Sequence, residues 1–396
     1  MSELLFIFGN TPELALYEAK AVLRRLNIVY REISYNDHVW QVSLGDNFQE
    51  KDAPLILIRA LGGTVKIARV ISQVERKRLE EAILDLFSSQ FSAESKKLTF
   101  GISWYGTKPL LPLKILKESL AKSGKASRFF LPAPGKKEIS SVVVTTQNLA
   151  EVIVFSSEGR LTIGLTTAVQ DYAAWGKRDY ERPAAQGHIG MLPPKVARMM
   201  VNLGLGQMSK KPTGKYLFAD PFCGTGTILA EALLCGCRVF GVDLDPEQVA
   251  RCRKNLQWLA GVYQISPDEF QITAGDARNL KKEIGIGAVD CLVTEPDLGP
   301  NQPGRGDPGE IKSRLEKLYL DCFADWRQAL TPIGCVAIAL PSFVLSRGGC
   351  EMVDDSLVKI VIDKVVPMGY SLAQGPYIYG RPQARVKRNI CIFKRV

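Results

Sequence analysis

The sequence has few of the residues that build metal sites. Only two histidines, His38 and His188, occur in 396 residues, and they lie far apart. The nine cysteines include one close pair, Cys235 and Cys237, but no second Cys or His pair follows at zinc spacing. We therefore expect reduced, scattered thiols and no bound metal.

Long hydrophobic runs are also missing. No run approaches the roughly eighteen apolar residues that a membrane-spanning helix needs. The N-terminal segment carries Glu3 where a signal peptide has basic residues, and its apolar stretch is too short for one. Hydrophobic residues at 46% and charged residues at 23% are ordinary for a globular chain. These features favour a cytoplasmic protein that works without a membrane.

Acidic residues are scarce in two stretches, 96–137 and 177–215. The net charge of +10 favours an anionic partner, and the first stretch holds a single acid, Glu118. One such run alone is as easily a solvated face, but two runs flanking a domain junction favour a track for phosphates. The basic residues that we predict to contact RNA are Lys96, Lys97, Lys114, Lys117, Lys122, Lys125, Arg128, Arg178 and Arg182.

Periodicity divides the chain into α+β and α/β parts. Residues 1–70 mix a helical pattern with apolar segments that read as strands, among them 54–61. Residues 71–168 contain short strand-like segments, including 140–146, and a basic helical pattern. The polar, aromatic stretch 169–190 has no sustained periodicity and is interpreted as a connector.

From residue 191 to 396, strand patterns alternate with helical ones. This order predicts a mainly parallel, doubly wound sheet, closed by an antiparallel hairpin over residues 370–395. Upstream, Trp104 and Tyr105 lie in the first basic stretch. They can stack on unpaired bases or fill a core, and we favour the core for Trp104.

The sharpest motif is DPFCGTGT, which begins at Asp220 between the first strand of the last domain and its helix. Gly224 and Gly226 let the chain turn sharply and bring the backbone close to a ligand. A nicotinamide-binding loop has a third glycine where this chain has Leu229, and an acidic strand end repels phosphate. The motif suits a ligand that carries a positive sulfonium and an amino group.

Two more carboxylates follow at strand ends. Asp243 lies about twenty residues after the glycine loop, where a carboxylate can accept both hydroxyls of a ribose. Asp276 ends the third strand, beside the same crevice, and can contact an adenine. Because open α/β sheets bind ligands outside the carboxyl ends of their strands, we expect these groups to converge. The alternative is that such residues only cap helices, as is credible for Asp245.

DPFCGTGT, followed by GVDLD and GDARNL, resembles the S-adenosylmethionine site of RNA methyltransferases that carry a THUMP domain, in particular the tRNA guanine-N2 methyltransferases that modify guanosine 10. FGNTPEL, LGGTVKI, RDYERP and GMLPPKVARMMVNL extend the resemblance over nearly the whole chain. It implies a ferredoxin-like domain (1–70), a THUMP RNA-binding domain (71–168), a linker (169–190) and a Rossmann-like methyltransferase domain (191–396). It also implies tRNA as partner and S-adenosyl-L-methionine as cofactor. The residues that would hold the cofactor are Asp220, Phe222, Gly224, Gly226, Asp243 and Asp276.

The catalytic motif departs from this family. Similar enzymes carry Asp-Pro-Pro-Tyr after the fourth strand. The carboxylate and a backbone carbonyl accept the hydrogens of an exocyclic amine there, and the ring stacks on the base. In this chain the predicted catalytic residues are Glu295, Pro296 and Asp297, followed by Leu298. Glu295 can replace the acceptor Asp, whereas Leu298 stacks more weakly than an aromatic ring.

Three interpretations of this variant stay open. It is a working variant that takes its stacking aromatic from elsewhere, for example Tyr377 or Tyr379; its specificity has moved to another base or atom; or the domain binds without catalysing transfer. We predict S-adenosylmethionine-dependent methylation of a guanine N2 amine in tRNA. The rivals are a DNA amino methyltransferase, which the THUMP-like half argues against, and a catalytically silent RNA-binding protein. The target nucleotide, the number of methyl groups and the oligomeric state are left open by the sequence.

Overall fold

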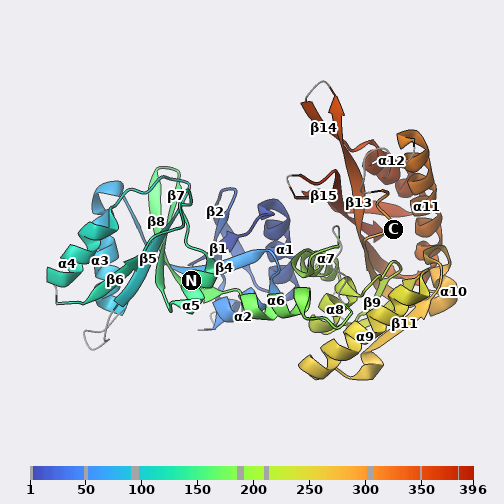
Figure 1. Ribbon diagram of the computed structural model, residues 1–396, viewed down its shortest axis with the longest axis horizontal. Coiled ribbons are helices and arrows are strands. Elements are labelled where there is room, and N and C mark those ends of the chain that lie inside the picture. Colours follow the sequence, from blue (N-terminus) through green and yellow to red (C-terminus); the bar gives the residue numbers. More distant parts are fainter. Residues whose placement is uncertain are drawn as a thin grey trace. The chain divides into compact units, whose positions relative to one another are not determined.

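The computed structural model describes residues 3–48, 52–90, 98–122, 124–184, 191–208, 214–300, 307–347, 350–381 and 383–396. The chain divides into two compact units, Met1–Tyr172 and Ala173–Val396. Each unit is built on its own sheet (Figure 1). Among the described helices, none has the length and the apolar character needed to cross a bilayer.

The first unit is one mixed sheet with the strand order β2-β3-β1-β4-β8-β7-β5-β6. Its strands are β1 (Glu3–Phe8), β2 (Tyr30–Tyr35), β3 (Val39–Leu44), β4 (Thr64–Val74), β5 (Leu98–Tyr105), β6 (Ser127–Phe130), β7 (Ala150–Ser157) and β8 (Arg160–Val169). Its helices are α1 (Pro12–Arg25), α2 (Ala53–Ala60), α3 (Leu79–Gln90), α4 (Leu113–Lys122) and α5 (Ser141–Thr146). Strand β4 pairs with β1 on one side and β8 on the other, so the sheet is continuous through residue 70. The division into ferredoxin-like and THUMP domains stays a prediction.

Residues 54–61 were predicted as a strand, and that prediction is wrong because most of the segment lies in helix α2. A short apolar run does not distinguish a buried strand from a helix by its period. The burial is one-sided as on a helix: Leu57 and Ile58 are buried, whereas Leu55 and Ile56 are exposed. Pro54 in the first turn favours the helix start, where its missing N–H is not needed.

The strand predicted over residues 140–146 is also wrong, since the segment forms helix α5. Its β-branched residues favour a strand. The side chain of Ser140, however, caps the helix by accepting a hydrogen bond from the backbone N–H of Val143 at 3.3 Å. The core interpretation of Trp104 is confirmed, because only 4% of this residue is exposed. Tyr105 is buried as well.

The second unit has the strand order β11-β10-β9-β12-β13-β16-β15, with β14 paired to β13. Its strands are β9 (Leu217–Asp220), β10 (Arg238–Asp243), β11 (Phe270–Ala274), β12 (Val289–Thr294), β13 (Leu330–Arg347), β14 (Cys350–Asp354), β15 (Tyr370–Tyr379) and β16 (Val386–Arg395). The first five strands are parallel, and β16 is antiparallel to both β13 and β15. The predicted doubly wound sheet and closing hairpin are therefore confirmed.

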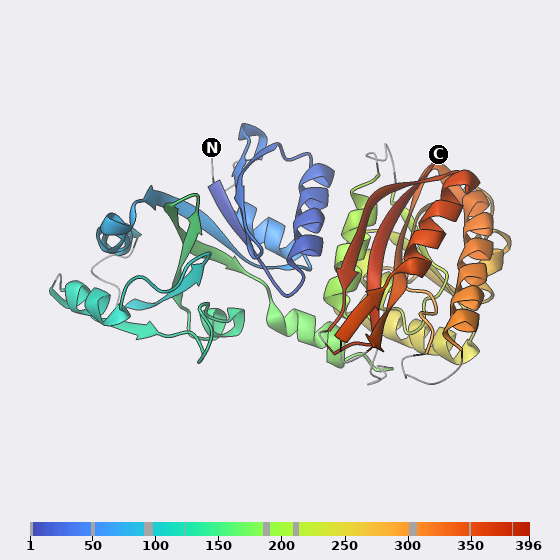
Figure 2. The same ribbon diagram turned by 90° about the horizontal axis from the view of Figure 1, so that it is seen from above.

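Helices cover both faces of the second sheet. The helices from the connector onward are α6 (Tyr172–Tyr180), α7 (Pro194–Leu205), α8 (Thr227–Leu234), α9 (Pro246–Tyr263), α10 (Leu280–Ile284), α11 (Pro308–Ala329) and α12 (Ser356–Val365). Figure 2 shows α11 and α12 along one face and α7 along the other. Strand β12 is buried along its whole length, as expected for a central strand between two helical layers. The connector, whose sequence has no sustained periodicity, contains helix α6.

Candidate functional site

The strand order of the second unit reverses between β9 and β12. Strands β9, β10 and β11 follow one another in one direction, whereas β12 and β13 continue in the other. In an open α/β sheet, such a switch point opens a crevice at the carboxyl ends of the strands. Asp220 ends β9, Asp243 ends β10 and Glu295 directly follows β12. The structure therefore brings three of the predicted site residues to the same edge.

The glycine turn after β9 uses its two glycines differently. Gly224 and Gly226 both have positive φ, +49° and +86°, in the left-handed region that favours glycine. A Cβ on Gly226 would lie 2.7 Å from the Sγ of Cys252 on α9, so this glycine permits close packing. A Cβ on Gly224 would meet no described atom within 4 Å. Gly224 therefore borders open space that a ligand can enter.

Asp243 holds the glycine turn in place. One carboxylate oxygen accepts the backbone N–H of Gly224 at 2.8 Å, and the other accepts that of Asp245 at 3.0 Å. Each oxygen keeps a lone pair with which it can accept a hydroxyl. Asp245 itself caps α9 by accepting the N–H of Glu247 at 2.8 Å, as the alternative interpretation expected for this residue.

Asp220 is a buried carboxyl group, with 1% of the residue exposed. It accepts hydrogen bonds from the Thr294 hydroxyl at 2.6 Å and from the N–H of Phe222 at 3.1 Å. Burial raises the pKa of Asp220 to about 7, against the lowering effect of these two bonds. A positive ligand beside it would favour the ionised form. The half-buried ring of Phe222 contacts Trp326 edge-on, with 6.5 Å between centroids.

Asp276 has a partner that the sequence did not indicate. Its two oxygens accept from Nε of Arg278 at 2.9 and 3.1 Å, and Nη2 lies 2.5 Å from the second oxygen. This pairing lowers the pKa of Asp276. The carboxylate also caps the 3₁₀ turn Ala277–Asn279 by accepting the N–H of Arg278 at 2.9 Å. A ligand at Asp276 therefore has to share it with Arg278.

Glu295, the predicted acceptor, is also paired. Arg388, on β16, donates from Nε to one oxygen of Glu295 at 2.7 Å and from Nη2 to the other at 2.9 Å. The guanidinium carbon of Arg388 lies 5.9 Å from the ring centroid of Tyr379. Sequence reasoning missed Arg388 because no motif surrounds it. Only the pairing of β16 with β13 brings this residue to the site.

The other two predicted catalytic residues have different surroundings. Pro296 is buried. Asp297 is exposed and accepts from Arg314 at 2.8 Å and from the N–H of Gly299 at 2.9 Å. Its backbone carbonyl accepts the hydroxyl of Tyr319 at 2.6 Å. Arg314 and Tyr319 belong to α11, so Asp297 anchors the loop to that helix.

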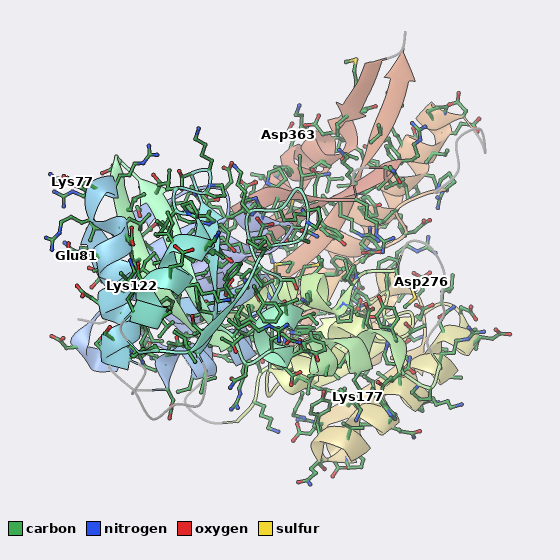
Figure 3. The ribbon with its side chains drawn as sticks, turned by 60° about the vertical axis from the view of Figure 1, so that its left-hand side comes forward. Lys77, Glu81, Lys122, Lys177, Asp276 and Asp363 are labelled. Carbon is green, nitrogen blue, oxygen red and sulfur yellow. The ribbon has the colours of Figure 1, made fainter. Side chains whose placement is uncertain are left out.

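The basic residues of the first unit lie mostly at its surface. Lys114, Lys117 and Lys122 are exposed on α4, and Lys122 is labelled in Figure 3. Arg128 is exposed on β6, with its guanidinium carbon 4.7 Å from the ring centroid of Phe130. Lys125 is half-buried and donates to the carbonyl of Phe87 at 2.8 Å. Lys96 and Lys97 lie outside the described residues.

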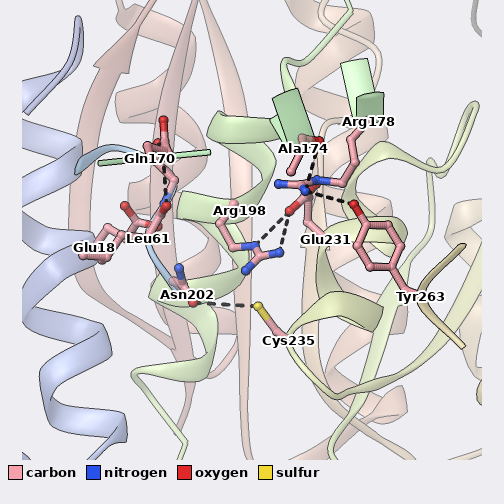
Figure 4. A network of polar contacts seen from close by, with 11 residues as sticks. Glu18, Leu61, Gln170, Ala174, Arg178, Arg198, Asn202, Glu231, Cys235 and Tyr263 are labelled. Atoms are coloured by element: carbon pink, nitrogen blue, oxygen red, sulfur yellow. Dashed lines mark hydrogen bonds and ion pairs between the residues drawn. The ribbon is translucent and has the colours of Figure 1, made fainter. Parts of the chain in front are cut away.

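Arg178 and Arg182, predicted to contact RNA, are buried in the structure. Arg178 donates to one oxygen of Glu231 at 2.8 Å, and Arg198 contacts the other at 2.8 Å (Figure 4). Arg182 donates to the hydroxyl of Thr227 at 2.8 Å. Both residues are 8% exposed. They tie the connector to α8, the helix that starts at the glycine turn.

Residues 181–341 match a family model described as an RMKL-like methyltransferase domain. The tRNA (guanine(10)-N2)-dimethyltransferase of Methanothermobacter thermautotrophicus is 35% identical over 167 residues, or 42% of this chain and 43% of that protein. Its counterpart from Pyrococcus abyssi is 32% identical over 36% of this chain and 38% of that protein. The alignments thus span about two fifths of these two relatives. A probable enzyme of the same name from Methanothermococcus thermolithotrophicus is 32% identical over 31% of this chain and 70% of that protein.

Two solved structures share the fold. TrmN from Thermus thermophilus aligns over 100% of both chains with a TM-score of 0.59 and 15% identity. A predicted N6-adenine-specific DNA methylase from Listeria monocytogenes aligns over 98% of this chain and 95% of that chain, with a TM-score of 0.50 and 14% identity. Together with the family match, they confirm the predicted Rossmann-like methyltransferase fold. No group of three or more potential ligands in the described part of the chain is placed to hold a metal ion.

Proposed function

The chain belongs to the family of tRNA (guanine(10)-N2)-dimethyltransferases, and we propose that it transfers methyl groups from S-adenosylmethionine to the N2 amine of a guanine in tRNA. Guanosine 10, the nucleoside in the names of the relatives, is the proposed target. The single observation that carries the proposal is the acidic edge of the sheet at the switch point, where a glycine turn meets the carboxyl groups of Asp220 and Asp243.

The residues at this edge of the sheet fit S-adenosylmethionine. Asp243 would accept the ribose hydroxyls with its remaining lone pairs, and the backbone beside Gly224 leaves room for the ligand. The buried Asp220 would stabilise the positive charge of the ligand. We propose Phe222, Gly226 and Asp276 as the remaining cofactor residues. When bound, S-adenosylmethionine supplies a methyl group activated by its positive sulfur.

Glu295 is the proposed acceptor for the amine. Its carboxylate would accept an N2 hydrogen, increase the electron density on nitrogen and take up the proton that is released when the methyl group moves to nitrogen. Pro296 fixes the backbone between the acceptor and Asp297, and Asp297 holds the loop against α11. Positioning of the amine is the main contribution of the chain.

The first unit is the proposed RNA-binding part. The exposed charges of Lys114, Lys117, Lys122 and Arg128 would contact tRNA phosphates, and we propose the same for Lys96 and Lys97. We also infer a cytoplasmic site of action, since the described cysteines are free thiols. The roles of Arg178 and Arg182 in RNA contact would require them to leave their buried partners.

One observation favours a second function, that of a catalytically silent RNA-binding protein. Both oxygens of Glu295 are already bonded to Arg388. Incubation of the purified protein with unmodified tRNA and methyl-labelled S-adenosylmethionine, followed by mass spectrometry of the nucleosides, separates the two. The proposed function predicts label in N2-methylated guanosine. Cofactor binding without any labelled nucleoside would refute it and leave the silent function.

A further inference from the structure

Glu295 is bound by two N–H donors that lie side by side in one plane. They are Nε–H and Nη2–H of Arg388, one on each carboxylate oxygen. Both side chains are largely buried, with 18% of Glu295 and 10% of Arg388 exposed. Paired parallel N–H bonds to a carboxylate give geometric specificity as well as strength. The contact therefore defines which hydrogen-bonding edge this carboxylate accepts.

Guanine presents the same edge on its Watson–Crick side. Its N1–H and one N2–H point in the same direction from two nitrogens joined through C2, just as the two arginine donors are joined through Cζ. Adenine and cytosine present a ring acceptor beside their amine instead. That acceptor would face a carboxylate oxygen without a hydrogen bond, which is unfavourable in a buried site. A carboxylate held in the geometry of Glu295 therefore discriminates in favour of guanine.

An aromatic ring lies near the guanidinium. The Arg388 guanidinium carbon lies 5.9 Å from the ring centroid of Tyr379, which is half-buried on β15. Aromatic rings are surfaces on which bases stack in RNA recognition. Leu298 follows the catalytic residues in the chain and offers no ring. Tyr379 can supply the stacking surface that the loop lacks.

We propose that Arg388 occupies the place of the target guanine, and that the base takes over its two hydrogen bonds to Glu295 and its position beside Tyr379. The inference rests on the proposed function, because it assigns the base recognised at the same site. Arg388 is then a specificity-determining residue. Its two N–H donors compete with the base for the carboxylate of Glu295, and a base without two adjacent donors does not replace Arg388.

The exchange is physically balanced. A buried carboxylate that loses its paired donors is strongly destabilised, so Arg388 leaves at low cost only when an equivalent pair of donors arrives. The released guanidinium regains contact with water. Competition lowers the apparent affinity for guanine to the intrinsic affinity multiplied by the fraction of molecules in which Arg388 has left Glu295.

The substitution Arg388→Lys tests this competition, because lysine keeps the positive charge but lacks the planar fork. Binding is measured for two tRNA transcripts, with guanine or inosine at the target position, in the presence of S-adenosylhomocysteine so that no methyl group can move. Inosine keeps N1–H and lacks the amine. We expect the guanine transcript to bind about tenfold more tightly to the variant than to the wild type, with inosine nearly unchanged. In turnover, KM should fall while kcat stays within about twofold.

Lys364→Gln is the matched control, since it breaks the exposed ion pair with Glu316 in the same unit and should change neither transcript's affinity. If Arg388 only positions Glu295, Arg388→Lys will lower kcat strongly and leave guanine affinity unchanged, which overturns the inference. Glu295→Gln is a second variant, because it retains a single acceptor oxygen and should lose the preference for guanine over inosine. A retained preference also overturns the inference. Absence of methylated guanosine with the wild type refutes the proposed function separately.

Discussion

The glycine turn after β9 and the loop after β12 lie at the same edge of one sheet, but different interactions hold them. The turn is held by Asp243, seventeen residues beyond Gly226 and on the neighbouring strand, through a bond to the N–H of Gly224. The loop is held on one side by Tyr319 of α11, which donates to the carbonyl of Asp297, and on the other by Arg388 of β16, which pairs with Glu295 from far along the chain. The glycine turn is thus held by a contact between neighbouring strands, whereas the predicted acceptor in the loop depends on a residue from a distant strand.

The largest expected effect concerns the support behind the turn. Glu231→Ala leaves the guanidinium groups of Arg178 and Arg198 buried without their shared partner. We expect a loss of about 3–5 kcal/mol in the free energy of unfolding. Urea denaturation measures it. A loss below about 1 kcal/mol would mean that the buried cluster contributes little to the support of α8.

Gly226→Ala tests the turn itself. The substitution places a Cβ at positive φ and 2.7 Å from Cys252 Sγ, so we expect a loss of about 2–4 kcal/mol in stability and no measurable binding of S-adenosylhomocysteine. Gly224→Ala is the matched control, because its Cβ meets only open space within the described structure. It should reduce ligand binding at a stability loss of about 1–2 kcal/mol. Equal stability losses in the two variants would contradict the different roles of the glycines.

The buried carboxyl of Asp220 makes the turn pH-dependent. Its pKa is raised to about 7, so the group is protonated below that pH and ionised above it. A positively charged cofactor prefers the ionised form, so its affinity should rise about tenfold from about pH 6 to about pH 8. Calorimetry of S-adenosylmethionine binding over this range provides the measurement. In Asp220→Asn the dependence should vanish; the same slope in wild type and variant would assign it to another group.

The same pKa has a consequence for stability. In the unfolded state the Asp220 carboxyl has the ordinary pKa of 3.8, so the folded state holds this proton more tightly. The contribution of the protonated Asp220 carboxyl to the free energy of unfolding therefore declines as the pH rises from about 4 to about 7. Asp220→Asn should flatten that part of the stability profile. Urea denaturation at several pH values measures the difference.

The smallest effects are expected at the α11 side of the loop. Tyr319→Phe removes the hydroxyl that donates to the carbonyl of Asp297 at 2.6 Å, and we expect a loss of about 1 kcal/mol in the free energy of unfolding. Arg314→Gln breaks the ion pair between Arg314 and Asp297, whose side chains are 55% and 44% exposed, and should change this free energy by less than about 0.5 kcal/mol. Thermal denaturation compares the two variants. A larger effect for Arg314→Gln would contradict the importance of burial for anchoring this loop.

Sequence reasoning succeeded where one element carries its own signal. The strand ends at Asp220 and Asp243, the two glycines and the parallel strand order were all readable from local patterns. It failed for the segments 54–61 and 140–146. In the first, the apolar run does not reveal its period; in the second, the cap at Ser140 outweighs the β-branched residues that follow.

Local patterns in the amino-acid sequence are sufficient to predict the doubly wound sheet and the glycine turn, because hydrophobic periodicity and glycine conformation act over a few residues. The packing of distant elements sets which side chains meet the loop after β12 and which basic residues are buried. Arg388 reaches Glu295 through the antiparallel pairing of β16 with β13, and Glu231 draws Arg178 away from the surface. Such contacts join residues from distant elements, and their geometry depends on how whole elements pack, which no local pattern encodes.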